Sequence, residues 1–164
     1  MHNAFLNIDN RKMSKSLGNF RTVREISEQY DLQVLRFFML NAHYRSPLNF
    51  SADLMEAAKN ALERITDAAA NLKDRKAAAQ TETATDAEKE LLAQAQEFVK
   101  KFEEAMDDDF NTADALAAIF ELVKFANTNV SEASSAEFAG ALLDTMVKIM
   151  RCTWSEGCEN RRNP

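Results

Sequence analysis

Residues 51–76, with the sequence SADLMEAAKNALERITDAAANLKDRK, decide the fold. A serine precedes a run of good helix formers, and neither glycine nor proline interrupts the run. Apolar side chains recur every three or four residues, the spacing that places them on one face of a helix. They are Leu54, Ala58, Ala61, Leu62 and Ile65. The stretch therefore predicts a long amphipathic helix that begins after Ser51.

Three more segments downstream show the same apolar spacing and recognisable helix starts. The predicted caps are Thr85 with Glu88, Asn111 or Thr112, and Ser134 with Glu137. Residues 77–85, rich in alanine and threonine, separate the first two helices and are the best candidate for a mobile loop. Residues 51–152 are therefore predicted to form an antiparallel bundle of four helices.

The sequence upstream of the bundle predicts smaller elements. Residues 5–8 alternate between apolar and polar types, as in a short strand, and a turn-prone Asp-Asn pair follows. Thr22 and Glu25 form the reciprocal pattern that caps a helix. The predicted inner face of this helix consists of Val23, Ile26 and Tyr30.

A second upstream helix is predicted to begin after Asp31 and to end before Pro47. Its run at 34–40 is apolar on almost every side, which requires burial. Because only about thirty residues precede it, we expect residues 1–50 to pack against something larger. The predicted fold is mostly α: a short strand and a loop, a small helical platform, then the bundle. Residues 153–164 are predicted to form an irregular tail.

Composition limits the class of protein. The 164 residues are 46% hydrophobic and 28% charged, as in a soluble globular domain, and only three Gly and two Pro favour long helices. No run is long enough to span a membrane, and the N-terminus lacks a signal-peptide pattern, so we expect a cytoplasmic protein. Cys152 and Cys158 lack zinc-site spacing and are interpreted as free thiols, so no metal ligand is predicted.

Charge is unevenly distributed along the chain. The net charge of −6 argues against a surface uniformly adapted to nucleic acid. Residues 1–50 nevertheless carry a balance of +3, whereas the rest of the chain carries −9. Any chemistry on phosphate therefore belongs to the first third of the chain.

Within that third, residues 10–19 form a basic loop with the core Lys12-Met13-Ser14-Lys15-Ser16. Two lysines three residues apart, with serines between and beside them, can present ammonium groups and hydroxyls to a polyphosphate. A lysine is a compact charge on a flexible stem and can follow charge that develops on a leaving group. A short Lys/Ser run is also common in solvated loops, so its context decides the interpretation.

The context resembles the class I aminoacyl-tRNA synthetases, and the cysteinyl-tRNA synthetases in particular. Residues 12–16 are similar to the second signature loop of class I. The match is dense over residues 1–60 and recovers at 106–125. It is carried by Met1-His2-Asn3, Lys12–Phe20, Asp31–Phe38, Ala42–Ser51 and Met106–Thr112.

The resemblance implies ATP-dependent activation of cysteine to an adenylate and its transfer to the 3′ end of tRNA(Cys). ATP with Mg²⁺ would be a substrate. Lys15 would stabilise the departing pyrophosphate, since such a displacement depends on positioning and charge neutralisation. Lys12 would have a secondary electrostatic or anchoring part, and Met13 would fill an apolar pocket. Ser14 and Ser16 would bond phosphate oxygens or cap the turn.

Two features that the resemblance implies are missing. A His-Ile-Gly-His type sequence, the first signature of class I, does not occur, and His2 and His43 each stand alone. The zinc ligands of the family belong to a nucleotide-binding region that is also missing. We therefore expect a C-terminal portion of a synthetase that is inactive alone, binds no zinc, and meets cysteine and ATP through the missing domain.

Two other clusters have competing interpretations. Asp107, Asp108 and Asp109 could bind magnesium, but three consecutive carboxylates cannot all face one ion on a helix. They are interpreted as a loop that favours the next helix start, with Phe110 inserted into the bundle. His43 and Arg45 lie at the end of the buried helix. They are interpreted as surface residues that pair with other side chains, and contacts to RNA are the alternative.

Two alternatives to the synthetase interpretation stay open. One is a fragment of the cysteine ligase of mycothiol synthesis, which shares the adenylate chemistry and the loop. The other is a non-catalytic helical module that binds tRNA or a protein. The missing nucleotide site favours the second alternative, whereas the apolar helix at 34–40, which requires an upstream domain, argues against it.

Overall fold

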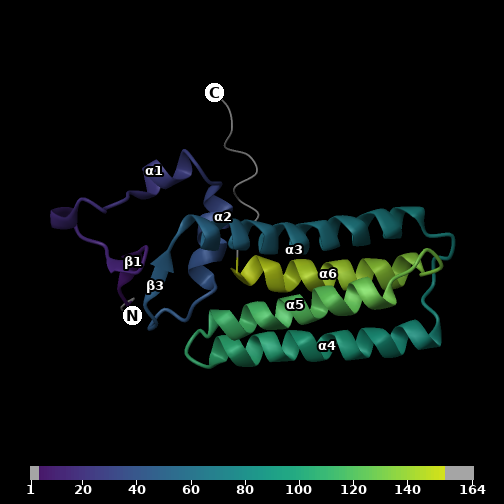
Figure 1. Cartoon of the computed structure of the whole chain (residues 1–164). Helices are drawn as coiled ribbons and strands as arrows, with labels where there is room; N and C mark the ends of the chain where they lie inside the picture. Colours follow the sequence, from purple (N-terminus) through teal and green to yellow (C-terminus); the bar gives the residue numbers. More distant parts are fainter. Residues whose placement is uncertain (1–3, 154–164) are drawn as a thin grey trace.

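The computed structural model describes residues 4–153, and their architecture is mostly α, as predicted (Figure 1). In chain order the elements are β1 (Leu6–Ile8), β2 (Arg11–Lys12), the 3₁₀ turn η1 (Lys15–Leu17), α1 (Val23–Ser27), α2 (Leu32–Leu40), β3 (Leu48–Phe50), α3 (Ala52–Ala78), α4 (Asp86–Asp107), α5 (Thr112–Asn129) and α6 (Ala136–Thr153). The four long helices lie side by side, and the strands with α1 and α2 gather at one end. Residues 154–164 of the predicted tail and residues 1–3 lie outside the described residues, and the structure does not describe the side chains of Cys152 and Cys158.

The core of the bundle lies between α3, α4, α5 and α6, which pack on one another. Its largest fully buried side chains include Met55, Ile65, Ile119, Phe138, Leu142 and Met146. Ser51 caps α3 as predicted, because its Oγ accepts a hydrogen bond from the Leu54 amide. The predicted inner position of Leu54 is wrong, since this side chain is exposed and its neighbour Met55 is buried. The apolar face of α3 is therefore rotated by one position at its first turn.

The start of α6 differs from the prediction by one residue. Ser135, not Ser134, accepts the hydrogen bond from the Phe138 amide through its Oγ, at 3.2 Å. Ser134 instead accepts from the Ser131 amide within the preceding turn. Thr85 and Glu88 do form the predicted capping box on α4. The same Glu88 carboxylate also accepts from Ser135 N at 2.9 Å and Ser135 Oγ at 3.0 Å, so one carboxylate joins the starts of two helices.

The segment between α3 and α4, predicted as the best candidate for a mobile loop, is bonded to the start of α6. The Ala136 and Glu137 amides donate to the carbonyls of Thr81 and Glu82. In return, the Ala84 amide donates to the Glu137 carboxylate at 2.8 Å, and the Ala84 side chain is buried. Glu137 therefore binds the α3–α4 connection and not, as predicted, its own helix start.

The apolar helix α2 is buried on one side within the chain itself. Phe37 and Phe38 are almost fully buried where α2 packs on α3 and α5, and Phe37 meets Phe120 edge to face at 6.4 Å. Met39 and Leu32 on the other side are exposed. The bundle thus covers only part of the helix.

The short helix α1 has the capping box that the sequence predicts. Thr22 and Glu25 exchange both hydrogen bonds of the box. Of the predicted inner face, Ile26 is buried and Tyr30 lies beyond the helix end, whereas Val23 is exposed, so its predicted burial is wrong. A helix of this length has room for little more than one buried position.

A three-stranded sheet in the order β2-β1-β3 carries the basic loop. The strand β1 lies within the predicted residues 5–8, and β2 is its antiparallel hairpin partner. The strand β3, which was not predicted, pairs parallel to β1 with Leu6 opposite Leu48 and Ile8 opposite Phe50. Phe50 contacts Phe38 of α2 edge to face, so the sheet is attached to the platform helix.

Candidate functional site

A tight hairpin leads into the basic loop. Its two central residues, Asp9 and Asn10, both have positive φ, as in the two-residue turns that fit the twist of antiparallel strands. Asn and Asp tolerate this conformation better than most other residues. The Asn10 amide donates to the Asn49 side chain at 2.7 Å, which ties the turn to β3. The turn-prone pair seen in the sequence thus reverses the chain and aims the loop away from the sheet.

The base of the loop is closed by the side chain of Asn19. Its Oδ1 accepts from the Ser14 amide at 2.9 Å, and its Nδ2 donates to the Lys12 carbonyl at 3.2 Å. The Met13 amide donates to the Leu6 carbonyl at 3.1 Å, and the Met13 side chain is half-buried. Gly18 ends η1 with φ of +66°, the left-handed conformation that glycine adopts freely. The backbone of residues 12–19 is therefore held at both ends.

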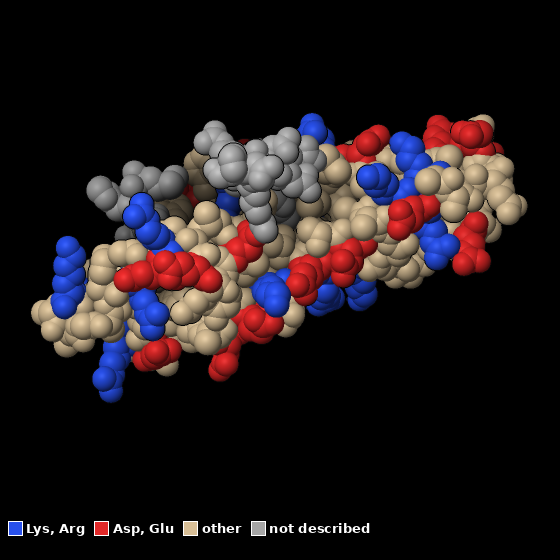
Figure 2. Space-filling model, turned by 90° about the horizontal axis from the view of Figure 1, so that it is seen from above, with Lys and Arg blue, Asp and Glu red and all other residues tan. Residues whose placement is uncertain are grey.

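Both lysines of the loop are exposed. The Nζ of Lys12 lies 4.4 Å from the centre of the Phe5 ring, and that of Lys15 lies 5.5 Å from the Phe20 ring. An ammonium over an exposed aromatic face is held by about 0.5–1 kcal/mol, so both can leave for a stronger anion. Lys and Arg side chains project around this end of the molecule in Figure 2. The excess of basic residues found in the first third of the sequence thus lies at the end of the molecule that carries the loop.

The two serines of the loop contact each other. Ser14 Oγ and Ser16 Oγ lie 2.6 Å apart, with either oxygen able to donate. Ser14 precedes η1 in an extended conformation, but its side chain does not cap that turn. One hydroxyl proton of the pair is therefore used internally, and the other can point to a ligand.

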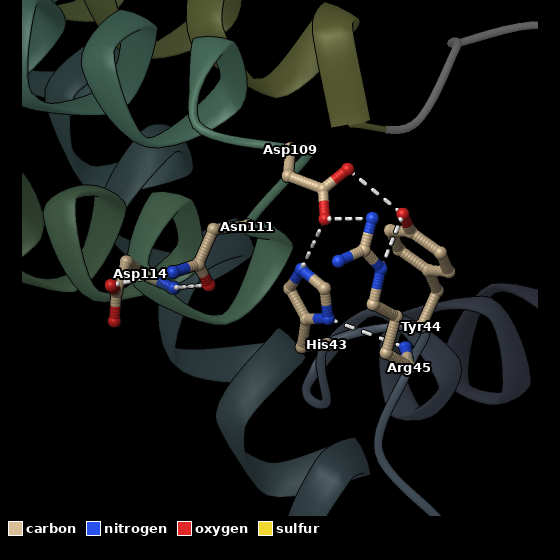
Figure 3. Close-up of polar contacts among 6 residues, drawn as sticks. All are labelled: His43, Tyr44, Arg45, Asp109, Asn111 and Asp114. Carbon is tan, nitrogen blue, oxygen red and sulfur yellow. Dashed lines mark hydrogen bonds and ion pairs between the residues drawn. The ribbon is translucent and has the colours of Figure 1, made fainter. Parts of the chain in front are cut away.

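A second polar cluster lies where the platform meets the bundle (Figure 3). Asp109, in the turn between α4 and α5, accepts a hydrogen bond from the Tyr44 hydroxyl at 2.8 Å. Its other oxygen pairs with Arg45 Nη2 at 2.9 Å and faces His43 Nε2 at 3.7 Å. Arg45 Nε also donates to the Tyr44 oxygen at 3.0 Å, and the His43 ring stacks on Tyr44. We call His43, Tyr44, Arg45 and Asp109 the junction cluster.

The electrostatics of the cluster follow from these contacts. The hydrogen bond to Tyr44, and then the charge of Asp109, raise the pKa of the Arg45 guanidinium above its ordinary value. His43 Nδ1 accepts from the Arg45 amide at 3.2 Å, so in the neutral imidazole the proton lies on Nε2, facing Asp109. The structure thus shows both sequence-predicted RNA contacts, His43 and Arg45, in contact with Asp109 of the same chain. Their RNA contacts stay a prediction.

The acidic run at 107–109 divides between different environments. Asp107 and Asp108 are exposed, and of the three only Asp109 belongs to the junction cluster. The predicted insertion of Phe110 into the bundle is wrong. Phe110 has φ of +54° and a 54% exposed side chain, because the turn that aims Asp109 at the platform directs Phe110 outward. Among the described side chains, those of residues 4–151, no group of three His, Cys, Asp or Glu could hold a metal ion.

Sequence reasoning found the loop but missed the residues that hold it. Asn19 and Asn49 are ordinary polar residues in sequence, and only their asparagine type next to turns could have drawn attention to them. Tyr44 and Asp109 lie 65 positions apart, and no periodic pattern connects them.

None of the helices in the described part of the chain is long and apolar enough to cross a membrane.

Two family models match this chain. The family model of the class I (C) tRNA synthetase catalytic domain matches residues 1–60, which include the loop and the platform. The DALR domain model matches residues 101–152 of the bundle.

Several curated relatives are named cysteine--tRNA ligase. That of Lachnospira eligens is 61% identical over 148 residues, which are 90% of this chain and 30% of the relative. That of Lachnoclostridium phytofermentans is 53% identical, covering 89% and 32%, and that of Clostridioides difficile is 51% identical, covering 88% and 31%. The chain thus spans about a third of the length of the curated relatives it matches.

A solved structure shares the fold. It is that of the LeuRS of Agrobacterium radiobacter K84 in a ternary complex with tRNA and LeuAMS, with a TM-score of 0.74 and 23% identity over 91% of this chain and 20% of that one. At this identity the likeness concerns the fold alone. Over about 90% of its length the chain is therefore similar to cysteine--tRNA ligases, with a class I (C) synthetase catalytic-domain match at residues 1–60 and a DALR match at residues 101–152.

Proposed function

We propose that this chain is the part of a cytoplasmic cysteine--tRNA ligase that supplies the loop on the pyrophosphate side of the adenylate-forming site. The observation that carries the proposal is the geometry of residues 12–19. Their backbone is fixed by Asn19, while the Lys12 and Lys15 ammonium groups are exposed and held only by weak contacts to aromatic rings. A fixed base with two free cations fits a triphosphate whose charge shifts during the reaction.

In the proposed reaction, ATP bound with Mg²⁺ is the substrate and cysteine attacks its α-phosphorus. Lys15 follows the negative charge that accumulates on the departing pyrophosphate, which lowers the barrier because phosphoryl chemistry depends on positioning and charge neutralisation. Lys12 adds a second positive charge at the base of the loop. The hydroxyl of Ser14 or Ser16 that is free of their mutual bond donates to a phosphate oxygen.

The bundle is proposed to face tRNA(Cys). The support is the DALR domain match at residues 101–152 and the basic balance of residues 1–50, which lie at one end of the same bundle. Cysteine would bind outside this chain. The zinc ion expected in the parent enzyme would also be bound outside this chain.

The test is a chimera in which the matching 148 residues of the Lachnospira eligens cysteine--tRNA ligase are replaced by those of this chain. We expect cysteine-dependent exchange between ATP and pyrophosphate to be retained in the chimera and undetectable for the chain alone. Lys15→Ala in the chimera should lower the exchange rate by about 10²–10³, the size of effect found when one group that stabilises developing charge is removed. The thermal midpoint should stay in place because Lys15 is exposed.

Lys89→Ala is the matched control, since Lys89 is an exposed lysine near the start of α4 that pairs with the exposed Asp86. An inactive chimera that is folded, or an unchanged rate for Lys15→Ala, would refute the proposal. Retained tRNA binding by the chain alone, together with an inactive chimera, would favour a non-catalytic helical module. Exchange by the chimera without charging of tRNA would favour the ligase that joins cysteine to an amino sugar.

A further inference from the structure

The junction cluster offers a further inference because it connects the signature loop to a distant part of the chain. Asp109 belongs to the turn between α4 and α5, whereas His43, Tyr44 and Arg45 follow α2 in the platform. Figure 3 shows the Asp109 carboxylate reaching from its turn across to the three platform side chains. Both of its oxygens are occupied, one by the Tyr44 hydroxyl and the other by Arg45 and His43.

The backbone of Tyr44 continues this connection toward the loop. The Tyr44 carbonyl accepts from the Ala4 amide at 2.9 Å, just before β1 begins. The Leu48 amide then donates to the Phe5 carbonyl at 3.1 Å and begins the pairing of β3 with β1. Because β1 also pairs with β2, and β2 ends at Lys12, hydrogen bonds joined by the covalent chain of Tyr44 and of β1 connect Asp109 to the first lysine of the loop.

The turn that carries Asp109 is built in an unfavourable conformation. Asp109 and Phe110 both have left-handed φ values, 55° and 54°, which a phenylalanine rarely adopts. Five backbone hydrogen bonds within residues 105–112 hold the turn in this form. The conformation leaves the Phe110 ring exposed beside a cavity of about 360 Å³ at the same junction. Such strain persists only where the surroundings fix it. Here the strained turn directs the Asp109 carboxylate toward Tyr44 and Arg45.

We propose that Asp109 is a positioning residue for the signature loop, acting through Tyr44: it fixes the strand β1, and with it Lys12 and Lys15, relative to the helical bundle. The proposal rests on the proposed function for its catalytic consequence and on the hydrogen bonds alone for its structural one. A lysine that must follow a leaving group is effective only from a defined starting position, and a misplacement of about 1 Å costs up to about a hundredfold in rate.

Two variants isolate the cluster without removing the turn. Asp109→Asn keeps an oxygen for Tyr44 and tolerates the left-handed conformation, but it removes the charge that pairs with Arg45. Tyr44→Phe removes only the hydroxyl that Asp109 accepts from. Asp108→Asn is the matched control. It removes the same negative charge from the neighbouring residue, whose side chain is exposed.

The first measurement is amide hydrogen exchange of the full 164-residue chain, which needs no activity. We expect both variants to speed exchange several-fold at the amides of residues 4–13, with exchange in α4 and α5 unchanged, and the control to match the parent chain. Unchanged exchange at residues 4–13 in Tyr44→Phe would overturn the proposal, whatever the chimera does. Acceleration spread evenly over the whole chain would also overturn it, because Asp109 would then act on general stability.

The second measurement applies the same variants to the chimera described above. We expect the kcat for pyrophosphate exchange to fall about tenfold, within the range for a displaced catalytic group, while the KM for cysteine stays unchanged. The variant Asp109→Glu keeps the negative charge and should therefore have a higher kcat than Asp109→Asn. Equal kcat values in parent and Tyr44→Phe chimera would overturn the catalytic part of the inference. An inactive parent chimera refutes the proposed function instead and leaves the exchange experiment to decide the positioning.

Discussion

The signature loop and the helical bundle are stabilised by different means. In the bundle, side chains such as Phe138, Leu142 and Met146 are fully buried, and apolar burial is the main driving force. In residues 4–20 none of the described side chains is fully buried, and the structure is held by backbone pairing, Asn19 and Asn49. The region that carries the Lys/Ser loop therefore has the least apolar burial, a property that binding loops commonly share.

The difference also separates what can be changed without loss of fold. A residue in the core of the bundle packs against neighbouring helices, whereas a residue in the loop is held by a few hydrogen bonds to residues close in sequence. In Figure 1 the strands, α1 and α2 lie at one end of the long helices α3, α4, α5 and α6. Mutations in the two regions should therefore affect different observables: global unfolding for the bundle, and local hydrogen exchange or activity for the loop.

The largest effect is expected in the bundle. Phe138→Ala removes a ring with no exposed surface at the start of α6 and should lower the free energy of unfolding by about 3–5 kcal/mol. Phe5→Ala makes the same substitution in the loop region, where the ring is 64% exposed, and should change it by less than about 0.5 kcal/mol. Urea denaturation of both variants measures the difference. Equal losses would mean that the loop region shares the core of the bundle.

A smaller effect is expected where one carboxylate joins two helix starts. Glu88 accepts four hydrogen bonds, two from Thr85 and two from Ser135, and every partner is a donor. In Glu88→Gln the amide nitrogen must face at least one of these donors, so the free energy of unfolding should fall by about 1–3 kcal/mol at pH 7. Glu90→Gln, two residues further along α4 at an exposed position, is the control and should be close to neutral.

The pH dependence of this effect has a definite sign. Burial acts to raise the pKa of Glu88, but the hydrogen bonds from Ser135 and Thr85 outweigh it and hold the pKa below the usual 4.5. A carboxylate whose pKa is lower in the folded state stabilises the fold above its unfolded pKa, and this stabilisation is lost as pH falls through the folded value. The stability difference between parent and Glu88→Gln should therefore be full at pH 6–7, by this linkage, and shrink below about pH 4.5. A difference that grows in acid would contradict it.

The sequence predicted those features that depend on neighbours along the chain. The caps at Thr22, Thr85 and Ser51 were found because a cap bonds to an amide three residues away. The wrong cap at the start of α6 shows the limit of such patterns. Ser134 and Ser135 are equivalent by local pattern, and the choice is made by Glu88, which lies 47 positions away from Ser135.

Features that depend on distant pairing were missed. The strand β3 has three residues, too few to carry a periodic signal, and it exists because β1 offers an edge to pair with. The burial of Met55 in place of Leu54 is set by how α3 rotates against α2 and α6. In the candidate site, the Lys/Ser run was visible, but nothing in sequence connects Tyr44 with Asp109. Catalytic roles for Lys12 and Lys15 stay a prediction.

The smallest effect on global stability is expected from Asn19→Ala, and it tests the comparison most directly. The substitution removes the hydrogen bonds to Ser14 N and the Lys12 carbonyl that close the base of the loop. If the loop opens independently of the bundle, the amides of residues 12–19 should exchange faster while the midpoint of urea unfolding stays in place, because the lost bonds belong to a unit that already opens first.

The matched control is Asn71→Ala, an exposed asparagine within α3, which should leave exchange at residues 12–19 unchanged. A drop of about 1 kcal/mol or more in global stability for Asn19→Ala, the value of a hydrogen bond that unfolds with the whole chain, would contradict the separation of the two regions. The loop would then be an integral part of the cooperative fold, and the freedom of Lys15 would have to come from its side chain alone. An unchanged midpoint with faster loop exchange places that freedom in the backbone as well, where the hydrogen bonds of Asn19 limit it.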